Sequence, residues 1–130
     1  MNYKPLIISE SENWFFGARQ SGKTYRCVKK FIEHYPNVLL VTSFGSRDAD
    51  SIISLIFSVG DYPPRLKTEI SKKVIPITNL KNRLLSIPKD TYKIMDDAWG
   101  GKESLYPAED IYKIFDYVTS SNREFIDSFI

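Results

Sequence analysis

The sequence predicts an α/β domain in which a parallel sheet is sandwiched between helices. Two observations lead to this fold class. Short apolar runs alternate with amphipathic helical patterns along the chain, and at least one of the runs is apolar enough to be buried on both faces. With 130 residues, of which 42% are hydrophobic and 26% charged, the chain has the size and composition of one globular domain, residues 1–130.

The first half of the chain is expected to contain two strands and two helices. Residues 13–16 form a short apolar run that ends at a glycine, which is typical of a buried strand. Residues 24–35 then place apolar side chains on one helical face, and a Pro-Asn pair ends that pattern. Residues 38–44, "VLLVTSF", form the second strand, and the apolar spacing across 49–56 indicates the second helix.

The second half continues the alternation with shorter elements. They are, in order, a turn at 60–64, a minor strand at 74–77, a short helix at 80–85, a strand at 92–95, a helix at 111–118 and a final strand at 125–130. The chain is therefore expected to end inside its last strand.

The most specific motif is "GARQSGKT" at 17–24, which fits the pattern G-x-x-x-x-G-K-[ST] without exception. It lies between a predicted strand and an amphipathic helix, where glycines allow amide groups to surround phosphate oxygens and the helix start favours an anion. Lys23 would reach the β- and γ-phosphates of ATP, and the Thr24 hydroxyl would bind Mg²⁺. The predicted nucleotide-binding residues are Gly17, Ala18, Arg19, Gln20, Ser21, Gly22, Lys23, Thr24 and Tyr25.

A second motif, "YKIMDDAW", supplies the acidic residues that hydrolysis needs at the end of another strand. Asp96 would hold Mg²⁺ through water, as a Walker-B-type aspartate does, and Asp97 would polarise the attacking water as a general base. A pair of aspartates after a strand also occurs in solvated turns, so this motif indicates a hydrolytic site only in combination with the intact phosphate loop.

With both motifs placed, the chain resembles the P-loop ATPases that have an additional strand between the phosphate-loop strand and the Walker B strand. Among these it is most similar to viral genome-packaging ATPases, both the small-phage packaging motors and the poxvirus-like FtsK/HerA type. The loop "GARQSGKT", with an arginine after its first glycine and alanine, carries the likeness to the phage motors. The order "VLLVTSF", "IMDDAW" and "SSNREFIDSFI" carries the likeness to the second group.

The resemblance implies a homo-oligomeric ring with ATP at its interfaces, double-stranded DNA in its channel and a capsid or portal protein as a further partner. Arg123 matches in position an arginine that points at a neighbour's nucleotide in such motors, and Arg19 is a candidate for a related role within its own chain. Solvent exposure without a role is the alternative for both arginines. The family usually continues past the strand in which this chain is expected to stop, so we expect either a fragment or a minimal domain, truncated after the fourth core strand.

Charge is distributed unevenly although the net charge is only +2. Residues 65–93 carry eight Lys and Arg against two Asp and Glu, whereas residues 94–130 carry three against eight. The basic stretch contains Arg65, Lys67, Lys72, Lys73, Lys81 and Arg83. Such charge binds phosphate backbones without regard to sequence, and it also serves solubility alone.

The sequence thus predicts an ATP- and Mg²⁺-dependent motor that translocates double-stranded DNA in viral genome packaging. Alternatives are a helicase, a helicase loader or another nucleic-acid-dependent ATPase, a small-molecule kinase, and a nucleotide-binding assembly subunit without turnover. No apolar run approaches the roughly 18 residues of a membrane span. The single cysteine, Cys27, fits an intracellular setting, which for a viral protein is the host cytoplasm or the virion.

Overall fold

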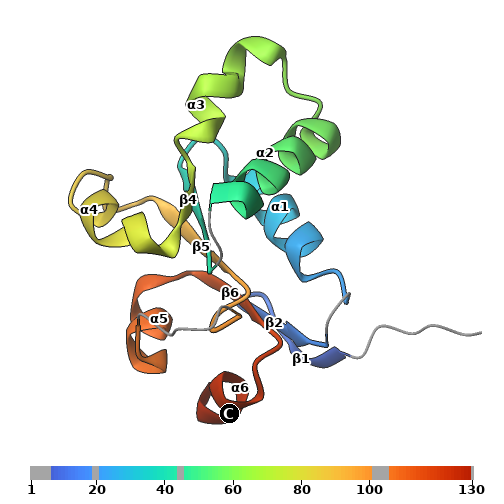
Figure 1. Cartoon of the computed structure of the whole chain (residues 1–130), viewed down its shortest axis with the longest axis vertical. Helices are drawn as coiled ribbons and strands as arrows, with labels where there is room; N and C mark the ends of the chain where they lie inside the picture. The colour runs from blue at the N-terminus through green and yellow to red at the C-terminus, as the bar shows by residue number, and fades with distance from the viewer. Residues whose placement is uncertain (1–6, 19–20, 44–45, 101–105, 130) are drawn as a thin grey trace, which may run out of the picture.

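A six-stranded, mostly parallel sheet forms the centre of the molecule (Figure 1). The computed structural model describes residues 7–18, 21–43, 46–100 and 106–129. The spatial order is β1-β2-β6-β5-β3-β4, and each neighbouring pair is parallel except the antiparallel pair of β1 and β2. The strands are β1 (Ile7–Glu10), β2 (Trp14–Gly17), β3 (Val38–Thr42), β4 (Val74–Pro76), β5 (Tyr92–Asp96) and β6 (Tyr117–Ser120).

Helices cover both faces of this sheet, as Figure 1 shows. One apolar cluster packs α1, α2 and α3 on the first face, and a second cluster packs α4, α5 and α6 on the other. The helices are α1 (Lys23–His34), α2 (Ser46–Gly60), α3 (Lys67–Ser71), α4 (Leu80–Leu84), α5 (Ala108–Ile114) and α6 (Arg123–Phe129), with short 3₁₀ turns η1 (Pro64–Leu66) and η2 (Ile77–Asn79). The predicted α/β class with a parallel sheet between helices is confirmed.

The central strands are apolar on both sides because successive residues alternate between the two clusters. In β2, Phe15 belongs to the first cluster and Phe16 to the second. In β5, Ile94 and Met95 divide in the same way, and all four side chains are at most 1% exposed. This two-sided burial holds the strand ends, and the polar residues that follow them, in fixed positions.

The strand that precedes the glycine-rich loop and the strand that ends in the acidic pair are not neighbours. β6 lies between β2 and β5 and pairs with both in parallel. The carboxyl ends of β2, β6, β5 and β3 therefore meet at one edge of the sheet, which is also where α1 begins. Open α/β sheets bind their ligands at this edge.

The last part of the chain differs from the sequence prediction. The expected strand at 125–130 is wrong, because these residues belong to α6 as far as Phe129 and residue 130 lies outside the described residues. The side chain of Asn122 accepts a hydrogen bond from the backbone N–H of Phe125 at 3.1 Å, which satisfies a free donor of the first turn. Phe125 and Ile126 are then buried against the second cluster.

The expected helix at 111–118 is correct only as far as Ile114. Phe115 is extended, and Val118 lies in β6. Ile111, Phe115 and Val118 all pack in the second cluster, so a helix followed by a strand imitates one helical face in the sequence. The strand that follows the acidic pair is therefore β6 at 117–120, and the chain does not end inside that strand.

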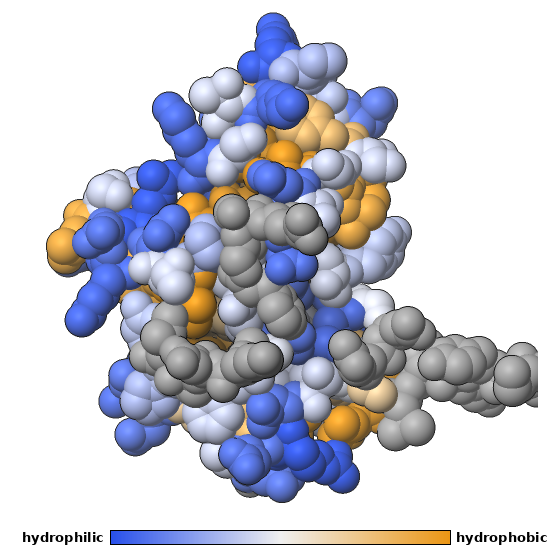
Figure 2. Space-filling model, viewed as in Figure 1, coloured by the Kyte–Doolittle hydropathy of each residue, from blue (hydrophilic) through white to orange (hydrophobic). Residues whose placement is uncertain are grey.

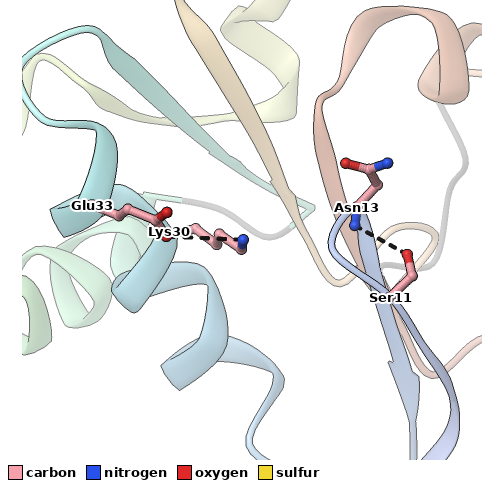
Figure 3. Close-up of polar contacts among 4 residues, drawn as sticks. All are labelled: Ser11, Asn13, Lys30 and Glu33. Carbon is pink, nitrogen blue, oxygen red and sulfur yellow. Dashed lines mark hydrogen bonds and ion pairs between the residues drawn. The ribbon is translucent and has the colours of Figure 1, made fainter.

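Local contacts fix the edge hairpin and the outer surface of α1 (Figure 3). The backbone N–H of Asn13 donates to the hydroxyl of Ser11 at 3.0 Å in the turn between β1 and β2. Lys30, which is partly buried, and Glu33, which is exposed, form an ion pair at 3.9 Å on α1. The hairpin adds β1, which the sequence patterns did not predict because this strand is short and half exposed.

Candidate functional site

The glycine-rich loop leads directly from a buried strand into a helix. Gly17 ends β2, and Gly22 precedes the first residue of α1 with φ of 88°. Only glycine adopts this left-handed conformation without strain, which explains the residue at this position. Arg19 and Gln20, two of the predicted nucleotide-binding residues, lie outside the described residues.

The start of α1 has polar groups that are suited to bind an anion. The helix has 12 residues, and no side chain of the described residues caps its first turn. The hydroxyl of Ser21 is buried and has no hydrogen-bond partner within the described part of the chain. Uncapped amide groups at a helix start and an unsatisfied buried hydroxyl together favour an anion at this position.

Lys23 lies in the same loop and is 9% exposed. Its ammonium group donates a hydrogen bond to the backbone carbonyl of Ala18 at 3.1 Å, across the loop. A positive charge is thereby held over the segment that the sequence predicts to surround phosphates. Tyr25, the last predicted nucleotide-binding residue, is 47% exposed on the first turn of α1.

The predicted metal ligands come together although they are 72 positions apart in the chain. The hydroxyl of Thr24 lies 3.5 Å from each carboxylate oxygen of Asp96. Asp96 ends β5 and is 3% exposed. The end of the glycine-rich loop and the end of the acidic strand therefore lie side by side, which is the arrangement that a shared site requires.

Burial and a neighbouring charge both act on Asp96. Desolvation is the main cause that raises the pKa of its carboxyl group to about 6, and the charge of Asp97 adds to the shift. Cys27 donates from its thiol to Oδ1 at 3.6 Å, and the hydroxyl of Thr119 does so at 3.4 Å. A buried carboxylate with its proton affinity raised in this way favours a nearby cation, because a cation would restore the charged form.

Asp97 has an unusual backbone conformation with φ of 57°. Its N–H donates to the Thr119 hydroxyl at 2.8 Å, and its carbonyl accepts from the Ser43 hydroxyl at 2.6 Å. The Ser121 hydroxyl donates to its Oδ1 at 3.4 Å. Asp97 is partly exposed and begins a turn closed by the N–H of Gly100, as the turn alternative predicts, but side-chain hydroxyls hold its backbone in place.

Four residues of the site were missed as site residues in the sequence: Cys27, Ser43, Thr119 and Ser121. Ser43 and Ser121 each follow directly after a parallel strand, β3 and β6, so strand-end position was the available signal. Cys27 is buried three residues after Thr24, and burial raises the pKa of its thiol well above the ordinary value. This argues against a reactive thiolate at Cys27.

Arg123 does not contribute to this cluster through any described contact. It is the first residue of α6, and its side chain is exposed. Its suggested role concerns a neighbouring subunit, which a single chain does not test, so that role stays a prediction. The role suggested for Arg19 stays a prediction as well.

Among the described residues, no group of three or more His, Cys, Asp and Glu side chains is gathered closely enough to hold a metal ion. Mg²⁺ usually takes only one or two protein carboxylates and completes its shell with phosphates and water, so Thr24 and Asp96 fit that ion together with a nucleotide.

No helix in the described ranges has both the length and the apolar character of a membrane span. Comparisons with protein-family models, curated proteins and solved structures each gave no match.

Proposed function

We propose that this domain is a P-loop ATPase of the additional-strand class, which binds ATP with Mg²⁺ at the carboxyl edge of its sheet and hydrolyses it. One observation carries the proposal: Thr24 of the glycine-rich loop lies 3.5 Å from both carboxylate oxygens of Asp96. The position of β6 between β2 and β5 supports the class, because one additional strand between these two is what the resemblance implies.

Each residue has a role that its position allows. Lys23 binds the β- and γ-phosphates in place of the Ala18 carbonyl, and the amide groups at the start of α1 bind phosphate oxygens. Thr24 and Asp96 hold Mg²⁺, which neutralises charge on the transferring phosphoryl group. Asp97, fixed in position by its backbone contacts, accepts a proton from the attacking water.

We further propose that the nucleotide energy drives movement of double-stranded DNA in viral genome packaging, in a homo-oligomeric ring. The basic stretch supports a nucleic-acid partner, because Arg65, Lys67, Lys72 and Lys81 are exposed on η1, on α4 and at or beside α3. Figure 2 shows hydrophilic side chains at the top and left of the molecule, where α3 and α4 lie in Figure 1, and also at the bottom, where α6 lies. Tyr62 packs against Tyr35 and Phe57, so the turn at 60–64 between α2 and η1 is held against the first cluster.

The test combines the rate of phosphate release with the mass of the assembly, measured without DNA, with duplex DNA and with single-stranded DNA. Stimulation by duplex DNA in a ring-sized assembly is expected. Stimulation by single strands alone would favour a helicase, and nucleotide binding with no turnover in any arm would favour an assembly subunit. Transfer of phosphate to a small acceptor would favour a kinase.

The basic stretch is tested with the double variant Lys72→Glu and Lys81→Glu, with Lys113→Glu on α5 as the matched control. Duplex affinity of the double variant is expected to fall at least about tenfold at low salt, because phosphate contacts release counterions. Equal affinity in both variants would show that DNA does not bind to this surface.

Mixing Lys23→Ala and Arg123→Ala chains tests the shared interface, because an arginine that acts on a neighbouring subunit's nucleotide restores activity in mixed rings.

A further inference from the structure

A single buried hydroxyl joins the two acidic residues of the proposed site. Thr119 is in β6, directly between the phosphate-loop strand and the acidic strand, and it is 0% exposed. Its Oγ1 accepts the backbone N–H of Asp97 at 2.8 Å and lies 3.4 Å from Oδ1 of Asp96, to which it donates. A hydroxyl has one proton and two lone pairs, so it makes both bonds at once.

We propose that Thr119 is a positioning residue, which fixes the Mg²⁺-binding carboxylate of Asp96 and the backbone of Asp97 relative to each other. This inference rests on the proposed function of the same site. In this proposal Thr119 does not contact the nucleotide itself, because its side chain is fully buried within the sheet.

The contact to Asp97 matters because that residue holds a left-handed backbone conformation, which aspartate and asparagine adopt more readily than other non-glycine residues but which is still uncommon. Its φ of 57° is in the left-handed region, and such a residue stays there only when surrounding contacts fix it. Three of those contacts are on the backbone: the N–H bonds to Thr119, and the carbonyl accepts from the Ser43 hydroxyl and the Gly100 N–H. Loss of the Thr119 hydroxyl would leave the N–H of Asp97 without this partner and allow its backbone to relax.

The contact to Asp96 matters because it selects one of the two carboxylate oxygens. Thr119 and Cys27 both bond to Oδ1, from β6 and α1, at 3.4 and 3.6 Å. Two donors on one oxygen limit rotation of the carboxylate, so its orientation towards Thr24 is set before any ligand arrives. Pre-set orientation of this kind reduces the reorganisation that ligand binding requires.

The test compares Thr119→Val, which keeps the branched shape and removes the hydroxyl, with Thr119→Ser, which keeps the hydroxyl and removes the methyl group. The readout is the affinity for a fluorescent ATP analogue with and without Mg²⁺, together with phosphate release and the temperature of unfolding. Thr91→Val is the matched control, because Thr91 is also buried but precedes β5 at the other end of that strand.

For Thr119→Val we expect affinity without Mg²⁺ to change less than about threefold, while the gain in affinity from Mg²⁺ and the turnover each fall at least about tenfold. Thr119→Ser should recover most of both, and Thr91→Val should match the wild type in both. A merely structural role for Thr119 predicts the opposite order, since the serine variant leaves a cavity at a fully buried position.

A wild-type response to Mg²⁺ in Thr119→Val would overturn the inference while leaving the proposed function intact. If that variant does not fold, loss of the Mg²⁺ response in a folded Thr119→Ser variant overturns it instead. Absence of Mg²⁺-dependent analogue binding in the wild type would contradict the proposed function, and the inference would fall with it.

Discussion

The two ends of the parallel strands bury very different groups. At the carboxyl edge six polar or charged side chains of the described residues are buried, namely Ser21, Lys23, Thr42, Asp96, Thr119 and Ser120. At the amino edge the described residues bury one such side chain, Thr91, and the surroundings are aromatic, with His34 stacked on Tyr92 at 3.6 Å between ring centroids.

The amino edge also has a hollow of about 330 Å³ that is lined in part by Trp14, Tyr112 and Phe115. This hollow is at the start of β2 and β6, away from the acidic pair. Of the six buried side chains at the carboxyl edge, only Ser21 has a buried polar atom without a hydrogen-bond partner in the described part of the chain, and a concentration of buried polar groups at one edge is what we expect of a binding site. The two edges show that buried polar side chains identify the candidate site, whereas a cavity alone does not.

The largest effect is expected for Asp97→Asn at the carboxyl edge. Asparagine tolerates the left-handed backbone as aspartate does, so the site should keep its shape and its ATP affinity. Removal of the base should lower turnover by about 10²- to 10⁴-fold, measured as phosphate release. Asp110→Asn on the exposed side of α5 is the control, and equal turnover in the two variants would exclude Asp97 as the base.

A smaller but still large effect is expected for Lys23→Ala. The variant loses the charge that is held over the loop, so ATP affinity should fall at least about 100-fold, as expected for the loss of charge-assisted hydrogen bonds. The measurement is the rise in unfolding temperature on addition of ATP, compared with Lys113→Ala. An unchanged rise in Lys23→Ala would refute the assignment of the loop.

Asp96→Asn should stabilise the nucleotide-free protein, with a dependence on pH. The folded-state pKa of about 6 is above the ordinary 3.8, so the native state binds the proton more tightly and loses stability as pH rises from about 4 to about 6. The loss is about 2 to 3 kcal/mol, and asparagine avoids it. We expect the variant to unfold several degrees higher at pH 7.5, with the difference vanishing near pH 4.

The pH series is measured by thermal unfolding without Mg²⁺ or nucleotide. A difference between Asp96→Asn and the wild type that stays constant from pH 4 to pH 8 would contradict the burial account of this carboxyl group. The same variant is expected to lose the gain in nucleotide affinity that Mg²⁺ provides, which separates the cost in stability from the role in the site.

The smallest effect is expected for Thr91→Val at the amino edge. The Thr91 backbone donates from its N–H to the carbonyl of Pro88 and accepts at its carbonyl from the ammonium group of Lys93, and valine retains both bonds. The change in unfolding free energy should be at most about 1 kcal/mol, with no change in nucleotide affinity. A large effect on nucleotide affinity would remove the contrast between the two edges.

Much of the fold could be predicted from the sequence because the central strands and α1 have strong local patterns. The strand β3 contains the uninterrupted apolar run 38–41, and α1 carries a clear apolar face. The C-terminal region could not be predicted in this way, since Ile111 and Val118 reach the same cluster from a helix and a strand. The cap at Asn122 was the available signal for α6, but its effect depends on Phe125 finding a buried position.

The candidate site also has residues that could be predicted from the sequence and residues that could not. Lys23, Thr24, Asp96 and Asp97 could be predicted because they belong to compact motifs in the sequence. Thr119 could not, because a threonine in a strand has no distinctive pattern, and only the order β2-β6-β5 places it beside both aspartates. Supporting residues of a site are set by strand order, which local sequence does not encode.

The most direct test of the central claim is calorimetric titration of the wild-type chain with a nonhydrolysable ATP analogue in the presence and absence of Mg²⁺. We predict one saturable site with a Kd in the range of about 1 to 100 μM, tightened by Mg²⁺ and lost in Lys23→Ala. No binding up to about 1 mM analogue, or binding that Lys23→Ala leaves unchanged, would contradict the claim that the buried polar edge is a nucleotide site.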